Sequence, residues 1–154
     1  MCAILDNDVA HQVFGRDRPP AGLAFRKWID SGKGQLIVGG QLRRELAENQ
    51  AFRLWLQQAL LKGRARSVSD AEVERRATYL KQAGLCRSND SHIVALAQLS
   101  NARLLYSNDD DLRRDFGNKQ LIDQPRGKVY STKQSNDFQE SHKRLLSQRR
   151  LCMR

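Results

Sequence analysis

The sequence predicts an α/β domain in which helices flank a central, mainly parallel sheet of about five strands. Short apolar runs alternate along the chain with longer amphipathic stretches, which is typical of strands that alternate with helices. The 154 residues suit one domain, and a composition of 40% hydrophobic and 29% charged residues allows a packed core with a solvated surface. Intrinsic disorder of the whole chain is therefore excluded.

The expected strands are the short apolar runs, at residues 2–5, 35–38, about 66–68, 103–106 and 128–130. Helices are expected between them, at about residues 20–29, 42–61, 69–82, 92–99 and 112–116. Pro19 and Pro20 can open the first of these helices, and Gly63 interrupts the long second one. Ser69 and Glu72 have the spacing of a capping box at the start of the third.

Positive charge is concentrated in the last quarter of the chain. The 27 Lys and Arg residues outnumber the 17 Asp and Glu residues, for a net charge of +10, and residues 118–154 hold nine of the basic residues but three acids, a local balance of +6. We expect a folded domain at residues 1–131 and a basic polar tail at 132–154, either helical or disordered. A basic surface favours a polyanionic partner and salt-dependent binding.

The composition gives no sign of a membrane protein. No apolar run approaches the roughly 20 residues that span a bilayer, and the amino terminus lacks the basic region of a signal peptide. We therefore expect a cytoplasmic protein without a membrane partner. Cys2, Cys86 and Cys152 are odd in number and form no CxxC motif, which argues against a disulfide framework and a structural zinc site and favours reduced thiols.

Acidic residues follow the expected strands in an ordered way. Asp6 and Asp8 come directly after the first strand, and Asp109–Asp111 closely follow the fourth. Glu45 lies early in the helix after the second strand, and Asp90 precedes the helix before the fourth. Because ligands of open parallel sheets bind at the carboxyl ends of the strands, these acids are expected to converge there.

Each of these acids also has an ordinary structural explanation. Asp6, Asp8 and Asp90 can cap helices, Glu45 can be a solvated helix residue, and Asp109–Asp111 can form a solvated turn. Independent caps do not explain why the acids occur in one ordered pattern. Gathered carboxylates repel one another unless cations intervene, and oxygen ligands suit Mg²⁺ or Mn²⁺, which can assist phosphodiester cleavage.

Four sequence segments resemble the PIN-domain family of metal-dependent nucleases. They are Ala3-Ile4-Leu5-Asp6-Asn7-Asp8-Val9, Leu42-Arg43-Arg44-Glu45-Leu46, Asp90-Ser91-His92-Ile93-Val94-Ala95-Leu96-Ala97 and Leu104-Leu105-Tyr106-Ser107-Asn108-Asp109-Asp110-Asp111-Leu112. The resemblance covers about residues 1–130. The third and fourth segments are its more specific part, and the basic tail lies outside it.

The resemblance implies a three-layer Rossmann-like fold, Mg²⁺ or Mn²⁺ as cofactor, and endonucleolytic cleavage, usually of single-stranded or structured RNA. The matching metal-site and catalytic residues are Asp6, Glu45, Asp90 and Asp109, with Asp111 as a secondary ligand and Ser107 in support. The chain departs from the family pattern in its three consecutive acids, which leave the choice of fourth ligand open among Asp109, Asp110 and Asp111. It also departs at Asp8, a further supporting candidate at a position where the family commonly has a small neutral residue. Arg43, Arg44 and Arg87 are candidates for substrate binding. Toxins of toxin–antitoxin pairs form a large share of the family, so an antitoxin protein and a second copy of the chain are candidate partners.

Two alternatives remain open at this point. A PIN-like fold can bind RNA or protein without cutting it. The first segment also resembles the first motif of haloacid-dehalogenase-type phosphatases, in which Asp6 would be the nucleophile and Asp8 the general acid/base. That second alternative leaves Glu45 and Asp90 without roles, and the chain lacks a convincing Lys or Thr motif for it.

Overall fold

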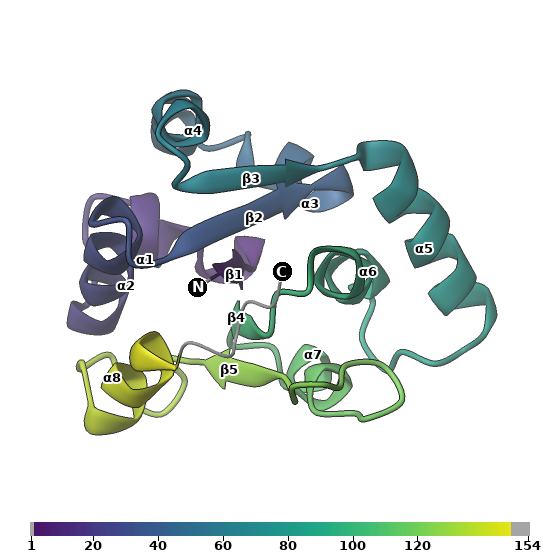
Figure 1. The fold of residues 1–154 in the computed structure, drawn as a ribbon. Coiled ribbons are helices and arrows are strands. Elements are labelled where there is room, and N and C mark those ends of the chain that lie inside the picture. The colour runs from purple at the N-terminus through teal and green to yellow at the C-terminus, as the bar shows by residue number, and fades with distance from the viewer. Residues whose placement is uncertain (1, 149–154) are drawn as a thin grey trace.

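The computed structural model describes residues 2–148 and contains one five-stranded sheet (Figure 1). The strands are β1 (Cys2–Leu5), β2 (Gln35–Gly39), β3 (Ala65–Val68), β4 (Leu104–Tyr106) and β5 (Lys128–Tyr130). They lie in the order β3-β2-β1-β4-β5, and every neighbouring pair is parallel. The predicted α/β class and the five predicted strands are confirmed.

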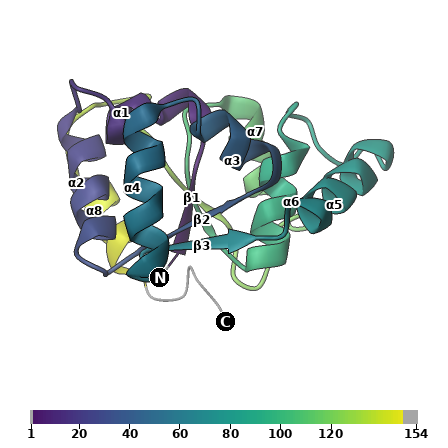
Figure 2. The same cartoon turned by 90° about the horizontal axis from the view of Figure 1, so that it is seen from above.

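Helices cover both faces of the sheet, which gives three layers (Figure 2). The helical elements within residues 2–148 are η1 (Asn7–Val9), α1 (His11–Phe14), α2 (Pro20–Asp30), α3 (Gly40–Leu46), α4 (Gln50–Leu61), α5 (Asp70–Gln82), α6 (Ser91–Ser100), α7 (Asp110–Phe116) and α8 (Glu140–Ser147). One layer holds α1, α2, α4 and α8, and the other holds α3, α5, α6 and α7. Strands β1 and β4 between these layers are fully buried, as expected for the centre of a doubly covered sheet.

Aromatic side chains fill the space between the sheet and α2. Phe25 of α2 packs edge-on against Tyr106 of β4 with ring centroids 5.0 Å apart, and Tyr106 lies 4.7 Å from Tyr130 of β5. The Tyr130 hydroxyl donates a hydrogen bond to the Ala21 carbonyl oxygen, so its buried polar atom is satisfied. These contacts fix α2 against the central strands.

The long helix predicted over residues 42–61 is wrong, because the chain forms two helices there. Helix α3 ends at Leu46, and α4 begins at Gln50 in the opposite layer (Figure 2). The Asn49 side chain accepts a hydrogen bond from the Phe52 N–H at 3.2 Å and thereby caps α4. One straight helix cannot lie in both layers. The break at residues 47–49 lets the chain pass from the layer on one face of the sheet to the layer on the other.

Replacing Asn49 by Ala is expected to lower the free energy of unfolding by about 1 kcal/mol, because α4 loses the side-chain acceptor at its first turn. Urea-induced unfolding followed by circular dichroism measures the change. Gln57→Ala, at an exposed position in the same helix, serves as the control and should leave the stability nearly unchanged. Equal losses in the two variants would contradict the capping role of Asn49.

The carboxyl-terminal part of the described chain packs against the domain. Helix α8 contacts α2 and β5, and the buried Trp28 indole Nε1 donates a hydrogen bond to the Leu146 carbonyl oxygen at 2.9 Å. Thr132 is also buried, where it bonds to Gln12 and Asn108. The domain boundary at residue 131 stays a prediction. The last six residues of the chain, 149–154, lie outside the described part.

The expectation that all three cysteines are reduced thiols is wrong for Cys2, which is disulfide-bonded. Cys86 is a free thiol whose pKa is raised to about 11 by burial and by the nearby charge of Asp115. Cys152 lies outside the described residues. Spacing along the sequence does not limit which cysteines meet in space, and that is why it was misleading here.

None of the helices within residues 2–148 combines the length and the apolar character needed to cross a membrane.

Candidate functional site

Two of the predicted acids lie where the direction of chain winding reverses. After β1 the chain builds β2 and β3 on one side, whereas β4 and β5 lie on the other, so the reversal falls between β1 and β4. Asp6 directly follows β1, and its N–H donates to the Tyr106 carbonyl oxygen at 2.9 Å. Asp109 follows β4 by three residues. The carboxyl ends of strands at such a reversal form the usual ligand crevice of open α/β sheets.

Ser107 joins these two acids. Its side chain is 1% exposed, and its Oγ donates a hydrogen bond to Asp6 Oδ2 at 2.7 Å. The same Oγ accepts a hydrogen bond from the Asp109 N–H at 3.1 Å. Asp109 Oδ1 in turn accepts a hydrogen bond from the Leu112 N–H at the start of α7, so Asp109 caps this helix and is also linked to Asp6 through Ser107.

The loop that precedes Asp90 is held in place by hydrogen bonds to a buried carboxylate. Asp115 of α7 is 2% exposed and accepts hydrogen bonds from the Arg87 N–H, the Ser88 N–H and the Ser88 Oγ, at 2.7, 3.0 and 2.6 Å. Ser88 Oγ then accepts from the Asp90 N–H at 3.2 Å. Asp115 therefore fixes the backbone just before Asp90 and α6.

Glu45 reaches the same edge because α3 begins directly at the end of β2. Gly40 adopts a positive φ of 58°, and a Cβ there would lie 2.7 Å from Val73 Cγ1, so a side chain would be both strained and crowded. The Gly40 N–H donates to Asp70 Oδ1 at 2.8 Å, and this bond, followed by the Arg43 guanidinium, lowers the pKa of Asp70. The start of α3 is thus anchored to α5.

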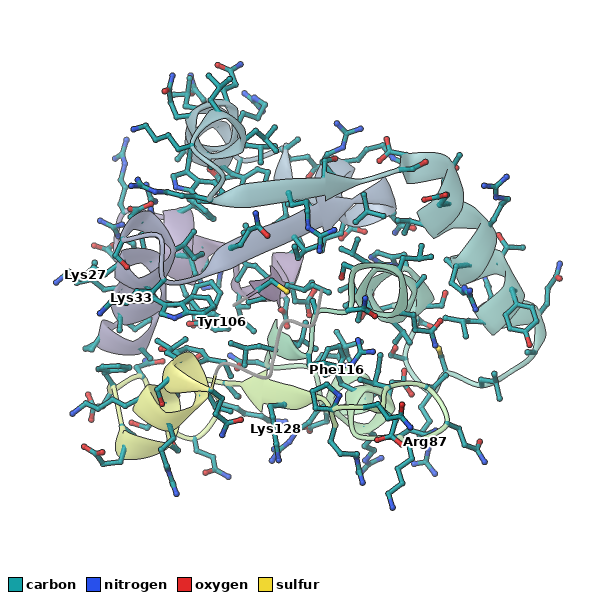
Figure 3. The ribbon with its side chains drawn as sticks, viewed as in Figure 1. Lys27, Lys33, Arg87, Tyr106, Phe116 and Lys128 are labelled. Atoms are coloured by element: carbon teal, nitrogen blue, oxygen red, sulfur yellow. The ribbon has the colours of Figure 1, made fainter. Side chains whose placement is uncertain are left out.

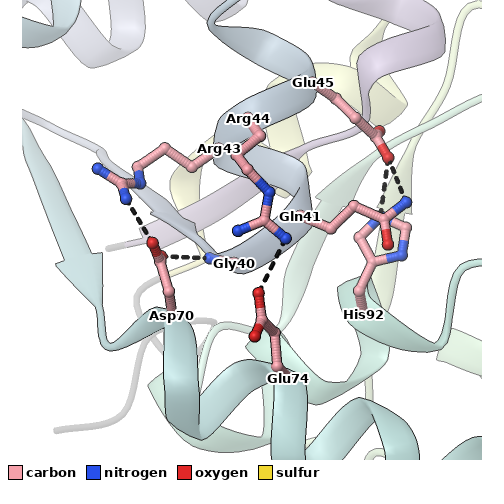
Figure 4. Close-up of polar contacts among 8 residues, drawn as sticks. All are labelled: Gly40, Gln41, Arg43, Arg44, Glu45, Asp70, Glu74 and His92. Carbon is pink, nitrogen blue, oxygen red and sulfur yellow. Dashed lines mark hydrogen bonds and ion pairs between the residues drawn. The ribbon is translucent and has the colours of Figure 1, made fainter.

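Two neighbouring side chains approach the Glu45 carboxylate (Figure 4). Gln41 Nε2 donates a hydrogen bond to Glu45 Oε1 at 2.7 Å, and His92 Nε2 lies 3.6 Å from the same oxygen. His92 is 6% exposed, and no hydrogen-bond partner for its Nε2 occurs in the described part of the chain. Burial lowers the pKa of His92, against the opposing effect of Glu45, so the ring is neutral at pH 7.

The acids act on one another electrostatically. The pKa of Asp8 is raised to about 7, first by loss of hydration among the surrounding protein atoms, then by hydrogen bonding with Asp6 and by the charges of Asp6, Asp109 and Asp90. Asp8 is nevertheless an exposed residue, so it is the acid of this set that solvent reaches most easily. The structure therefore brings Asp8 together with Asp6, Asp90 and Asp109.

Asp90 responds in the same way. Desolvation is the largest cause that raises its pKa to about 6, followed by the charges of Asp6, Asp109 and Glu45. The charges of Asp6, Glu45 and Asp109 thus all act on Asp90. We refer to these four residues and Asp8 as the acidic cluster. Like charges at this range favour the neutral forms of the acids unless a cation balances them.

The donor chemistry of the acidic cluster fits a hard divalent cation, because its ligating atoms are all carboxylate oxygens in a partly desolvated setting. The side-chain positions are not those of a closed metal cage: within residues 2–148, no three His, Cys, Asp or Glu side chains are grouped so that they could hold a metal ion. Mg²⁺ usually keeps several waters and binds through few protein ligands, so an open arrangement suits it.

Other predicted residues lie outside the acidic cluster. Asp111 is exposed and faces Arg114 at 3.8 Å, and Asp110 pairs with Lys133. Among the candidate substrate-binding residues, Arg43 pairs with Asp70 and Arg44 with Glu74. Arg87 is exposed, and Figure 3 shows it at the other end of the molecule from Lys27 and Lys33.

Sequence reasoning missed two residues that hold the site, Asp115 and Gln41. A signal for Asp115 was present: with Leu112 and Phe116 it occupies positions i, i+3 and i+4 of α7, so an acid sits on the face that packs against the core. A buried acid at such a position needs several hydrogen-bond donors. Gln41 gave no comparable signal, because an exposed Gln on a helix is ordinary.

A model of the PIN domain matches residues 3–115, which is well over half of the chain. A comparison with curated proteins gives no match. The matched range contains all five residues of the acidic cluster, and the observed sheet and its flanking helices have the architecture that the resemblance implied. The chain belongs to the PIN-domain family.

Proposed function

We propose that this protein is a metal-dependent endoribonuclease that hydrolyses phosphodiester bonds of RNA at the acidic cluster. PIN domains are generally nucleases. The observation that carries the proposal is the meeting of Asp6, Glu45, Asp90 and Asp109 near the winding reversal of the sheet, where desolvation and then the charges of the other three raise the pKa of Asp90. The family match also favours a nuclease over the haloacid-dehalogenase-type phosphatase.

In this proposal Asp6, Asp90 and Asp109 hold Mg²⁺ or Mn²⁺, directly or through water, and Glu45 completes the site or orients the attacking water. The bound ion would activate water and stabilise the negative charge that develops on the phosphate. Ser107 keeps Asp6 and Asp109 in a fixed relation, while Gln41 orients Glu45. In-line attack on phosphorus would leave a 5′-phosphate and a 3′-hydroxyl.

The charge of the chain supports a nucleic acid as substrate. The chain carries a net charge of +10 although it contains the acidic cluster, so basic groups outside the cluster are available to hold the phosphate backbone. We extend the proposal to a toxin of a toxin–antitoxin pair, with an antitoxin as protein partner. A small adjacent gene for a DNA-binding protein would support that extension.

The proposal predicts cleavage of single-stranded RNA in Mn²⁺ or Mg²⁺ and none in EDTA. Asp109→Asn should abolish cleavage because a carboxylate of the acidic cluster is lost, whereas Asp111→Asn, a matched change two residues away at an exposed position, should retain most of it. Denaturing gel electrophoresis of end-labelled RNA measures both, and thermal unfolding checks that the two variants fold.

The alternative, a PIN-like module that binds RNA without cutting it, gives a different result. Purified protein in Mn²⁺ would then leave varied RNAs intact and retard them on a native gel. That outcome would contradict the nuclease proposal. Equal cleavage by the Asp109→Asn and Asp111→Asn variants would instead contradict the assignment of the site.

A further inference from the structure

A polar cavity of about 380 Å³ opens between α3, α5 and α6, next to the acidic cluster. Gln41 and Arg44 line it from α3, Thr78 and Lys81 from α5, and His92 from α6. A larger cavity of about 880 Å³ lies between α2 and α8, where Lys27 and Lys33 contribute to its wall. We refer to the first of these as the α3–α5–α6 cavity, and it shares residues with the surroundings of Glu45.

The cavity wall combines two kinds of polar group over an apolar base. Lys81 and Arg44 supply positive charge, and the Glu74 carboxylate, which also lines the cavity, is paired with Arg44 at 2.9 Å, so Lys81 is the cation left for a phosphate among the lining residues that the structure describes. Amide and hydroxyl groups come from Gln41, Thr78, Asn89 and Ser91, and Val73 and Ala77 form the apolar part. Cations suit a phosphate, while amides and hydroxyls suit the hydrogen-bonding edge of a base.

Two contacts connect this cavity with the acidic cluster. Gln41 and His92 both line the cavity, and both approach Glu45 Oε1, at 2.7 and 3.6 Å (Figure 4). Asn89 and Ser91 also line it, and they flank Asp90 in the sequence. The His92 Nε2 is buried and makes no hydrogen bond within the described residues, so its polar neighbour on the cluster side is Glu45, at 3.6 Å. His92 and Gln41 therefore stand between the cavity and the acidic cluster and have polar atoms near the same Glu45 oxygen.

We propose that the α3–α5–α6 cavity binds one nucleotide of the RNA strand beside the cleaved phosphate. This inference rests on the proposed nuclease function and adds to it the subsite that selects the cleavage position. Lys81 contacts the phosphate of that nucleotide, and Asn89 and Ser91 contact its base. The cavity volume is at the lower end of the range for small-molecule sites, which suits a single nucleotide.

Binding without cleavage tests the phosphate contact. In EDTA, the affinity of the wild-type protein for a short fluorescein-labelled single-stranded RNA is measured by anisotropy over a series of salt concentrations. Lys81→Ala should weaken binding several-fold and reduce the slope of log Kd against log salt by about 0.7, the contribution of one phosphate contact to a single strand. Arg76→Ala removes a charge from the same helix outside the cavity and should change neither.

Cleavage of a random-sequence RNA pool in Mn²⁺ tests the base contact. Sequencing of the products from wild-type protein should show a base preference at one fixed position relative to the cut. Asn89→Ala should weaken the preference at that position alone, and Lys81→Ala should raise KM while the preference persists. A merely structural role of Asn89 would change kcat or thermal stability and leave the preference intact.

The two experiments separate failure of the subsite from failure of the nuclease proposal. If wild-type protein cleaves RNA but Lys81→Ala and Arg76→Ala bind alike and Asn89→Ala keeps the wild-type preference, the subsite is wrong and the nuclease stands. If wild-type protein cleaves no RNA, the nuclease proposal fails, and the Lys81 and Arg76 salt slopes still decide whether a strand enters the cavity. Identical slopes would overturn the subsite in that case too.

Discussion

Asp90→Asn is expected to abolish RNA cleavage and at the same time to raise the melting temperature of the metal-free protein. The loss of activity should exceed about 100-fold, more than is usual for residues that only support metal ligands. The gain in stability has the same origin, because desolvation and the charges of Asp6, Asp109 and Glu45 raise the pKa of Asp90 to about 6 and so disfavour its ionised form. A neutral amide of similar shape removes that penalty.

Differential scanning fluorimetry in EDTA and in Mn²⁺ tests this opposite pair of effects. Without metal, the variant should melt above the wild type at pH 8. With Mn²⁺ at about 100 times its Kd, the wild type should gain about 5–10 °C, and the variant much less. Asp111→Asn is the matched control and should behave like the wild type in both conditions. A destabilised metal-free Asp90→Asn protein would contradict the electrostatic interpretation of the cluster.

The stability of the metal-free protein should decrease between about pH 4 and pH 7 because of Asp8. The pKa of Asp8 is 3.8 in the unfolded chain and about 7 in the folded protein. Between these two values the folded protein holds a proton on Asp8 that the unfolded chain has lost. The stabilisation that this proton confers is fully present below pH 3.8 and is lost as the pH rises through 7. Asp90, raised to about 6, adds a contribution of the same sign.

Comparison of Asp8→Asn with the wild type isolates this contribution from those of other acids. In EDTA, the difference in melting temperature should be small at pH 4 and should grow in favour of the variant up to about pH 8. Asp17→Asn, the same change at an exposed acid outside the acidic cluster, is the control variant. A constant difference across this range would show that Asp8 titrates normally.

The fold could be predicted largely because strands and acids are local features. Each central strand is a short apolar run, and Asp6 and Asp109 stand beside such runs, so topology alone brings them to one edge. The crossing at residues 47–49 could not be predicted from periodicity, because the leucines of α3 and α4 continue one amphipathic pattern although they pack in different layers. The side chain of Asn49 was the local sign of that break.

The supporting contacts of the site depend on distant pairs and were therefore out of reach. Asp115 binds the loop before Asp90 across 27 or more residues, and Ser107 reaches Asp6 across 101. The family resemblance named Ser107 without a reason for it, and it gave no place to Asp8, which stands where the family commonly has a small neutral residue. Their roles follow from the hydrogen bond to Asp6 and from the raised pKa of Asp8, both of which require coordinates.

The acidic cluster also bears on how such a chain persists through evolution. None of its members belongs to the buried hydrophobic core of the described residues, so we expect the fold to tolerate the loss of any one of them. Losing one would even relieve repulsion, and mutational drift would therefore favour its loss in a protein that needed only the scaffold. A chain that carries all the acids therefore bears an electrostatic cost in its metal-free form, and the proposed nuclease chemistry would account for that cost.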